Sequence, residues 1–101
     1  SGGFNIYPSD LEAELCREPG VAEAAVVGMP SRKWGESPVG FVVLEDGAGD
    51  PATIMAAVNA RLGKTQRLAA LHPIAEMPRS HIGKLLKTEL REEAARLGGI
   101  D

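Results

Sequence analysis

The sequence predicts an α+β domain in which three helices pack around a small mixed sheet of about three strands. Helical patterns with their own start and stop signals occur near both ends and in the middle of the chain, and short apolar runs typical of strands lie between them. With 101 residues the chain is the size of one ordinary domain with one core. We therefore expect residues 1–101 to form a single domain.

The first helix is expected at about residues 9–17. Ser9 and Glu12 have the spacing of a capping box, in which each side chain bonds the backbone amide of the other. Leu11 and Leu15 share one face of this helix, and a Pro-Gly pair follows its end. The segment is therefore a short helix with one apolar face to bury.

Three apolar runs predict the strands of the sheet. The first two, Ala24–Val27 and Val39–Leu44, are joined by a polar loop at residues 31–37. The third run covers residues 68–74 and contains Pro73, which has no backbone N–H to donate. That strand is expected to be short or to lie at an edge of the sheet.

The second helix follows a turn rich in glycine and aspartate. Asp50 suits its N-cap and Pro51 its first position. An apolar stripe forms one face of this helix: Ile54, Val58 and Leu62. Gly63 is expected to end it.

The last helix is expected to begin at Leu86 or Lys87 and to end at Leu97. Glu92 and Arg96 lie one helical turn apart and are expected to pair. The loop before this helix, residues 77–83, carries the most specific motif of the chain.

Composition excludes several classes of function. The net charge of −3 gives no reason to expect nucleic acid or an anionic membrane as a partner, and no apolar run approaches the roughly 18 residues of a membrane span. Cys16 has no partner for a disulfide and is expected to be a small buried apolar residue, while His72 and His81 lack the spacing of metal ligands. With no secretion signal visible, a soluble cytoplasmic protein is expected.

The most specific stretch of the sequence runs from Pro78 to Arg91. Its Gly83-Lys84 pair does not belong to a phosphate-binding P-loop, because that motif needs glycine in place of Pro78 and serine or threonine in place of Leu85. The stretch resembles instead the last motif of the adenylate-forming, AMP-binding enzyme superfamily, Pro-x-x-x-x-Gly-Lys followed by a basic helix.

Three further stretches resemble the same superfamily, in the same order. They are the residues around Gly2–Glu12, which are similar to its hinge motif, then Pro19–Pro30, and then Gly35-Glu36. Together they resemble the small C-terminal lid domain of an acyl-CoA synthetase. The resemblance implies that residues 1–7 adjoin the hinge, with a remnant of its hairpin, and that the main partner is the enzyme's own large N-terminal domain.

The resemblance also implies a two-step reaction and a role for Lys84. A carboxylic acid reacts with ATP, whose Mg²⁺ is held by the large domain, to give an acyl adenylate, and coenzyme A then takes the acyl group. A cation placed where negative charge accumulates lowers the barrier of the first step, and the long stem of lysine suits this task. Lys84 is therefore the catalytic candidate, with Gly83 beside it in the cofactor site. The isolated domain is expected to be inactive.

Three residues are candidates for contact with coenzyme A. Gly3 matches a hinge glycine that leaves room for the pantetheine arm. Trp34 follows two cations and suits stacking on adenine, although it would equally suit packing over the edge of the core. Arg67 matches a basic position before the third strand, but the aromatic and lysine that many relatives carry there are absent.

Two alternatives remain beside the coenzyme A ligase. One is the lid of an adenylation domain that loads a carrier protein, although Asn5–Pro8 is more similar to the coenzyme A ligases. The other is a free-standing interaction domain with this fold. A preceding large domain in the gene would exclude the second alternative.

Overall fold

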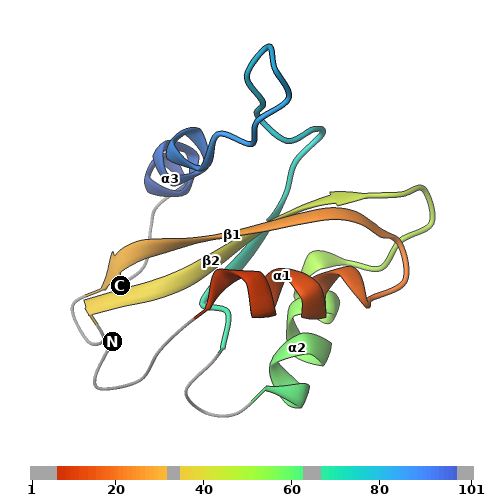
Figure 1. Cartoon of the computed structure of the whole chain (residues 1–101). Helices are drawn as coiled ribbons and strands as arrows, with labels where there is room; N and C mark the ends of the chain where they lie inside the picture. Colours follow the sequence, from red (N-terminus) through yellow and green to blue (C-terminus); the bar gives the residue numbers. More distant parts are fainter. Residues whose placement is uncertain (1–6, 32–34, 63–66, 98–101) are drawn as a thin grey trace.

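The computed structural model describes residues 7–31, 35–62 and 67–97. Within these ranges the chain forms three helices and a three-stranded mixed sheet, which confirms the predicted α+β class (Figure 1). The elements follow in the order α1 (Pro8–Cys16), β1 (Val21–Ser31), β2 (Gly35–Leu44), α2 (Pro51–Arg61), β3 (Ala70–Pro73) and α3 (Lys87–Arg96). The expected hinge remnant at residues 1–6 lies outside the described ranges.

The sheet has the order β1-β2-β3. β1 and β2 are antiparallel, and their register runs from Val21 opposite Leu44 to Ser31 opposite Gly35. β3 runs parallel to β2 and lies at the edge. The prediction from Pro73 is confirmed, since an edge strand tolerates a residue that cannot donate a ladder hydrogen bond.

The first two strands are longer than their apolar runs, so the predicted loop at residues 31–37 is wrong at both ends. β1 continues to Ser31 and β2 begins at Gly35, and Ser37 is buried opposite Met29. An antiparallel ladder is held by backbone hydrogen bonds, so it extends through polar residues that show no apolar pattern. Residues 32–34, which include Trp34, lie outside the described residues.

Helices cover both faces of the sheet (Figure 1). Alternate residues of the strands point to opposite faces, as in Val27 against Val26 and Phe41 against Val42. On one face the buried cluster comprises Ala25, Val27, Met29, Val39, Phe41, Met77, Leu90 and Ala94, with the last two from α3. On the other it comprises Leu11, Leu15, Val26, Val42, Ile54, Val58 and Leu68, from α1, α2 and the strands. The sheet is therefore the middle layer of three.

The predicted capping box at the start of α1 is wrong. The helix begins at Pro8, with Tyr7 as N-cap and no side-chain capping bond, because proline is favoured at a first helical position. Glu12 faces the edge of β1 instead. Its Oε2 accepts the backbone N–H of Val26 at 2.8 Å and pairs with Lys87 Nζ at 2.9 Å. The carboxylate thereby satisfies a backbone donor that the outer edge of β1 leaves unpaired.

Two other predictions about single residues are wrong. Cys16 is exposed, because it directly follows the buried Leu15 and so points to another side of α1. Arg96 pairs with Glu93, three residues before it, at 2.5 Å, and not with Glu92. The hydrogen bond from Arg96 lowers the pKa of the Glu93 carboxyl below its ordinary value of 4.5.

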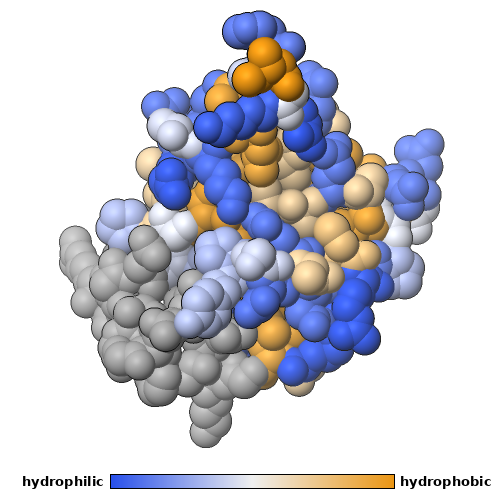
Figure 2. Space-filling model, in the orientation of Figure 1, coloured by the Kyte–Doolittle hydropathy of each residue, from blue (hydrophilic) through white to orange (hydrophobic). Residues whose placement is uncertain are grey.

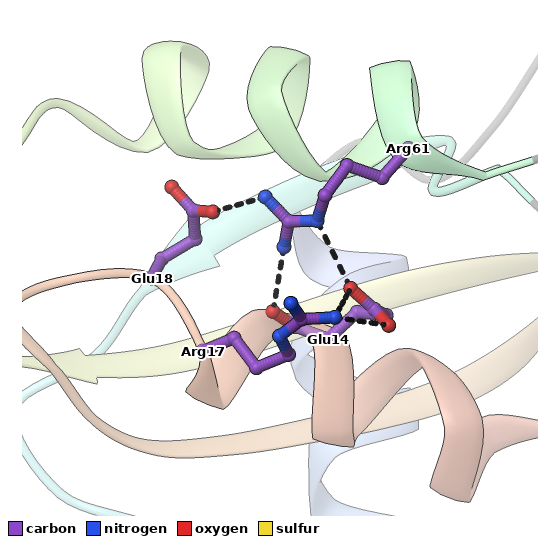
Figure 3. Close-up of polar contacts among 4 residues, drawn as sticks. All are labelled: Glu14, Arg17, Glu18 and Arg61. Atoms are coloured by element: carbon purple, nitrogen blue, oxygen red, sulfur yellow. Dashed lines mark hydrogen bonds and ion pairs between the residues drawn. The ribbon is translucent and has the colours of Figure 1, made fainter.

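An arginine at the end of α2 joins the two helices of one layer (Figure 3). Arg61 Nε lies 3.0 Å from Glu14 Oε1, and Arg61 Nη1 lies 2.5 Å from Glu18 Oε2. Its Nη2 also donates to the backbone oxygen of Glu14 at 3.1 Å. The hydrogen bond from Arg61 lowers the pKa of the Glu14 carboxyl, and the charge of Arg17 acts in the same direction. α1 and α2 are thus joined by charge as well as by apolar contact.

Candidate functional site

The residues between β3 and α3 form a short hairpin, which we call the lysine hairpin (residues 79–85). At its base, Arg79 and Leu85 form an antiparallel bridge. Directly beyond it, Leu86 N–H donates to Pro78 O at 2.9 Å. Leu85 is half-buried against the core under α3, whereas the tip of the hairpin projects from the body of the molecule (Figure 1).

Gly83 makes the tight turn of this hairpin possible. Gly83 N–H donates to Ser80 O at 2.8 Å, Ser80 N–H donates to Lys84 O at 2.9 Å, and Lys84 N–H reaches Ser80 Oγ at 3.2 Å. Gly83 has a φ of +88°, the left-handed conformation that hairpins with three-residue loops place at this position. Apart from its two chain neighbours, no atom of the described residues lies within 4 Å of a Cβ built there, so the requirement for glycine comes from the backbone and not from crowding.

Lys84 directly follows this turn and is exposed. In the part of the chain that the structure describes, no acceptor bonds its Nζ. At the tip of the hairpin Ile82 is also exposed, to 78%. Figure 2 shows a small apolar patch among hydrophilic residues at the top of the molecule. Among the described residues, the hairpin therefore presents an exposed cation on a long stem.

The side chain of Arg79 connects the hairpin to β1 through two contacts. Its Nη1 lies 3.3 Å from the carbonyl oxygen of Gly83, and its Nη2 forms an ion pair with the carboxylate of Glu23 on β1. Glu23 lies 56 positions away in the sequence, so no local pattern indicates the contact.

A groove next to the hairpin base is acidic and does not suit phosphates. It lies between the segment before the hairpin and α3, and its charged lining comprises Glu23, Glu76, Arg79, Glu89, Glu92, Glu93 and Arg96. Carboxylates outnumber guanidinium groups there, and like charge repels an anion. Among the described residues, a phosphate is better matched by Lys84 than by this groove.

Of the coenzyme A candidates, Arg67 alone lies in the described ranges, since Gly3 and Trp34 fall outside them. Arg67 is exposed, and the residue after it is fixed by Asn59 of α2. Leu68 N–H donates to Asn59 Oδ1 at 2.9 Å, and Asn59 Nδ2 donates to Leu68 O at 3.1 Å. Because Arg67 precedes β3 and Lys84 follows it, the structure places these two cations at opposite ends of that strand.

Residues 7–31, 35–62 and 67–97 contain neither a candidate metal site nor a helix that could span a membrane. No three or more His, Cys, Asp or Glu side chains gather there in a way that would hold a metal ion. None of the helices there has the length and apolar character needed to cross a membrane. The Mg²⁺ expected in a large domain and the cytoplasmic location stay predictions.

The family described as the AMP-binding enzyme C-terminal domain matches residues 10–84. This chain belongs to that family. Its curated relatives include a 2-succinylbenzoate–CoA ligase of Geobacillus kaustophilus, 41% identical over 92 residues, which are 90% of this chain and 19% of the ligase. A long-chain-fatty-acid–CoA ligase of Mycobacterium tuberculosis is 37% identical over 93 residues, which are 92% of this chain and 18% of that ligase. The chain therefore spans about a fifth of such relatives.

Solved structures of longer chains contain a region that is similar to this chain. ATP-bound MatB from Rhodopseudomonas palustris matches with a TM-score of 0.86 and 34% identity, over 95% of this chain and 19% of that one. The amide bond synthetase McbA from Marinactinospora thermotolerans matches with a TM-score of 0.81 and 33% identity, over 89% of this chain and 18% of that one. The chain therefore spans about a fifth of each of these chains as well.

Proposed function

We propose that this chain is the lid domain of an ATP-dependent acid–CoA ligase and that Lys84 takes part in forming the acyl adenylate. The observation that carries the proposal is the position of Lys84, an exposed cation beside the tight turn of a projecting hairpin. A side chain placed in this way can enter a site formed by another domain, where negative charge accumulates between a carboxylate and the α-phosphate of ATP.

The contribution of Lys84 would be electrostatic. Attack of the carboxylate oxygen on the α-phosphorus breaks the bond to pyrophosphate and places additional charge on the oxygens around phosphorus. An ammonium group close to these oxygens stabilises the transition state more than the separated reactants, which is the condition for catalysis. Acid, ATP and Mg²⁺ would be held by a large domain, so the isolated chain is expected to be inactive.

The second half-reaction would use a different surface of the domain. Arg67 lies at the opposite end of β3 from the lysine hairpin, so a rotation of the lid would withdraw Lys84 and bring Arg67 towards the acceptor. Gly3 and Trp34 are the other proposed contacts with coenzyme A. The names of the ligase relatives support coenzyme A as the acceptor. McbA is named an amide bond synthetase, so its similarity is compatible with another nucleophile as the acceptor.

The test is Lys84→Ala in the full-length protein. Loss of one such stabiliser is expected to lower acid-dependent ATP–pyrophosphate exchange by about a hundredfold to a thousandfold. Arg17→Ala is the control, because Arg17 is an exposed cation directly after α1 whose side chain pairs with Glu14, away from the hairpin. Undiminished exchange in Lys84→Ala would remove the lysine from the mechanism.

The acceptor is tested separately, with wild-type protein. Coenzyme A and a phosphopantetheinylated carrier protein are offered in turn to the enzyme that has made its adenylate. Consumption of coenzyme A supports the proposal, and transfer to the carrier alone would favour the carrier-loading alternative. Absence of any acid-dependent exchange would favour a domain that serves interaction only.

A further inference from the structure

The lysine hairpin is attached to the rest of the domain by ion pairs at both sides of its base. Arg79 opens the hairpin and pairs with Glu23 of β1. Lys87, which begins α3 just after the hairpin, pairs with Glu12 of α1. Both carboxylates thus come from α1 and β1, neighbouring elements far from the hairpin in sequence.

The contacts of Arg79 couple the sheet to the residue directly before Lys84. One guanidinium nitrogen bonds the carbonyl oxygen of Gly83, and another bonds the Glu23 carboxylate. A guanidinium is planar and holds its donors in fixed relative directions. The direction of the hairpin, and with it the start of the Lys84 side chain, is therefore linked to β1 through a single rigid group.

Lys87 supports the other side of the base, and its contact is itself held in place. Glu12 Oε2 accepts the Val26 N–H at 2.8 Å while it pairs with Lys87 Nζ at 2.9 Å. The carboxylate thus bonds the backbone of β1 and the lysine at the same time. The start of α3 is fixed with it, so the hairpin has a rigid support on each side.

We propose that Arg79 and Glu23 are positioning residues, which hold the lysine hairpin in the direction that adenylate formation requires. This inference rests on the proposed function of Lys84. Exposed ion pairs add little to stability, and both side chains here are more than 40% exposed, with 44% for Arg79 and 42% for Glu23. Their effect is therefore expected in the rate of the first half-reaction and not in the melting temperature.

The experiment compares Arg79→Lys and Glu23→Gln in the full-length protein. Lysine keeps the charge but cannot bond both partners from one plane, and glutamine keeps the shape but loses the charge. Each variant is expected to lower kcat for pyrophosphate exchange by about threefold to fivefold, because an exposed ion pair shifts the population of hairpin directions only by its own small contribution. KM for ATP and the rate of thioester formation from supplied acyl adenylate should stay within about twofold of wild type.

Arg96→Lys is the matched control. Arg96 and Glu93 also form an exposed Arg–Glu pair, on α3, without touching the hairpin. This variant should leave both half-reactions unchanged. In the double variant of Arg79→Lys and Glu23→Gln, the loss should be smaller than the product of the two single losses, because either change already breaks the same contact.

The possible outcomes separate this inference from the proposed function. If Lys84→Ala abolishes exchange while Arg79→Lys and Glu23→Gln behave like Arg96→Lys, the positioning role is wrong and the lysine role stands. Equal loss in both half-reactions, or single losses that multiply in the double variant, would also overturn the positioning role. Undiminished exchange in Lys84→Ala would overturn the proposed function itself.

Discussion

At the scale of single residues, the lysine hairpin depends on one backbone conformation. Gly83 stands in the left-handed region, and its surroundings leave space for a side chain. The glycine is therefore needed for its φ angle. The motif predicts the glycine, but it does not predict the φ angle or the brace from Arg79, because these depend on hydrogen bonds to Ser80 and on Glu23 of a distant strand.

Gly83→Ala is expected to lower the free energy of unfolding by about 1–2 kcal/mol, the cost of holding an L-residue in the left-handed region. Urea denaturation of the 101-residue chain measures it. Gly49→Ala is the control, since Gly49 has no such φ and its added Cβ would only reach Ile54 Cγ1 at 4.0 Å. Equal stability of the two variants would contradict the backbone argument.

At the scale of elements, α2 fixes the entry of the chain into β3. Asn59 donates to and accepts from the backbone of Leu68, in the way that a neighbouring strand would. Ala69 N–H then donates to Pro38 O at 2.8 Å, and the parallel pairing with β2 follows. The sequence predicts helix and strand separately, but their connection through Asn59 depends on the parallel packing, which no local pattern reveals.

Asn59→Ala is expected to destabilise the domain by about 1–3 kcal/mol, because a half-buried N–H and C=O lose their partners. Thermal unfolding followed by circular dichroism measures the loss. An unchanged melting temperature in Asn59→Ala would contradict the role of these two hydrogen bonds.

The contact between α1 and α2 predicts that the stability of the domain depends on pH. Because the pKa of Glu14 is lowered in the folded chain, its contribution to stability is present above the ordinary value of 4.5 and is lost as the pH falls through the lower folded value. Arg61→Gln should therefore reduce the loss of stability below about pH 4.5, which urea midpoints between pH 3 and 7 would measure. If Arg61→Gln lost as much stability in acid as the wild type, the role of Arg61 would be contradicted.

At the scale of the whole molecule, the fold was largely predictable and the candidate site only partly. The apolar alternation in β1 and β2 and the stripe of α2 predict a sheet with helices, and Pro73 predicts the edge strand. The strand ends were missed because polar residues pair through their backbones. The motif predicts Lys84 as a candidate, whereas no local pattern predicts the contacts of Arg79 and Glu12, because their partners are distant in sequence.

We propose that one end of this domain serves adenylate formation and that the other serves the acceptor. Single-turnover kinetics of both half-reactions in full-length Lys84→Ala tests this division. We expect a fall of about a hundredfold or more in adenylate formation, with thioester formation from supplied acyl adenylate within about twofold of wild type. An equal fall in both half-reactions, or in neither, would contradict it.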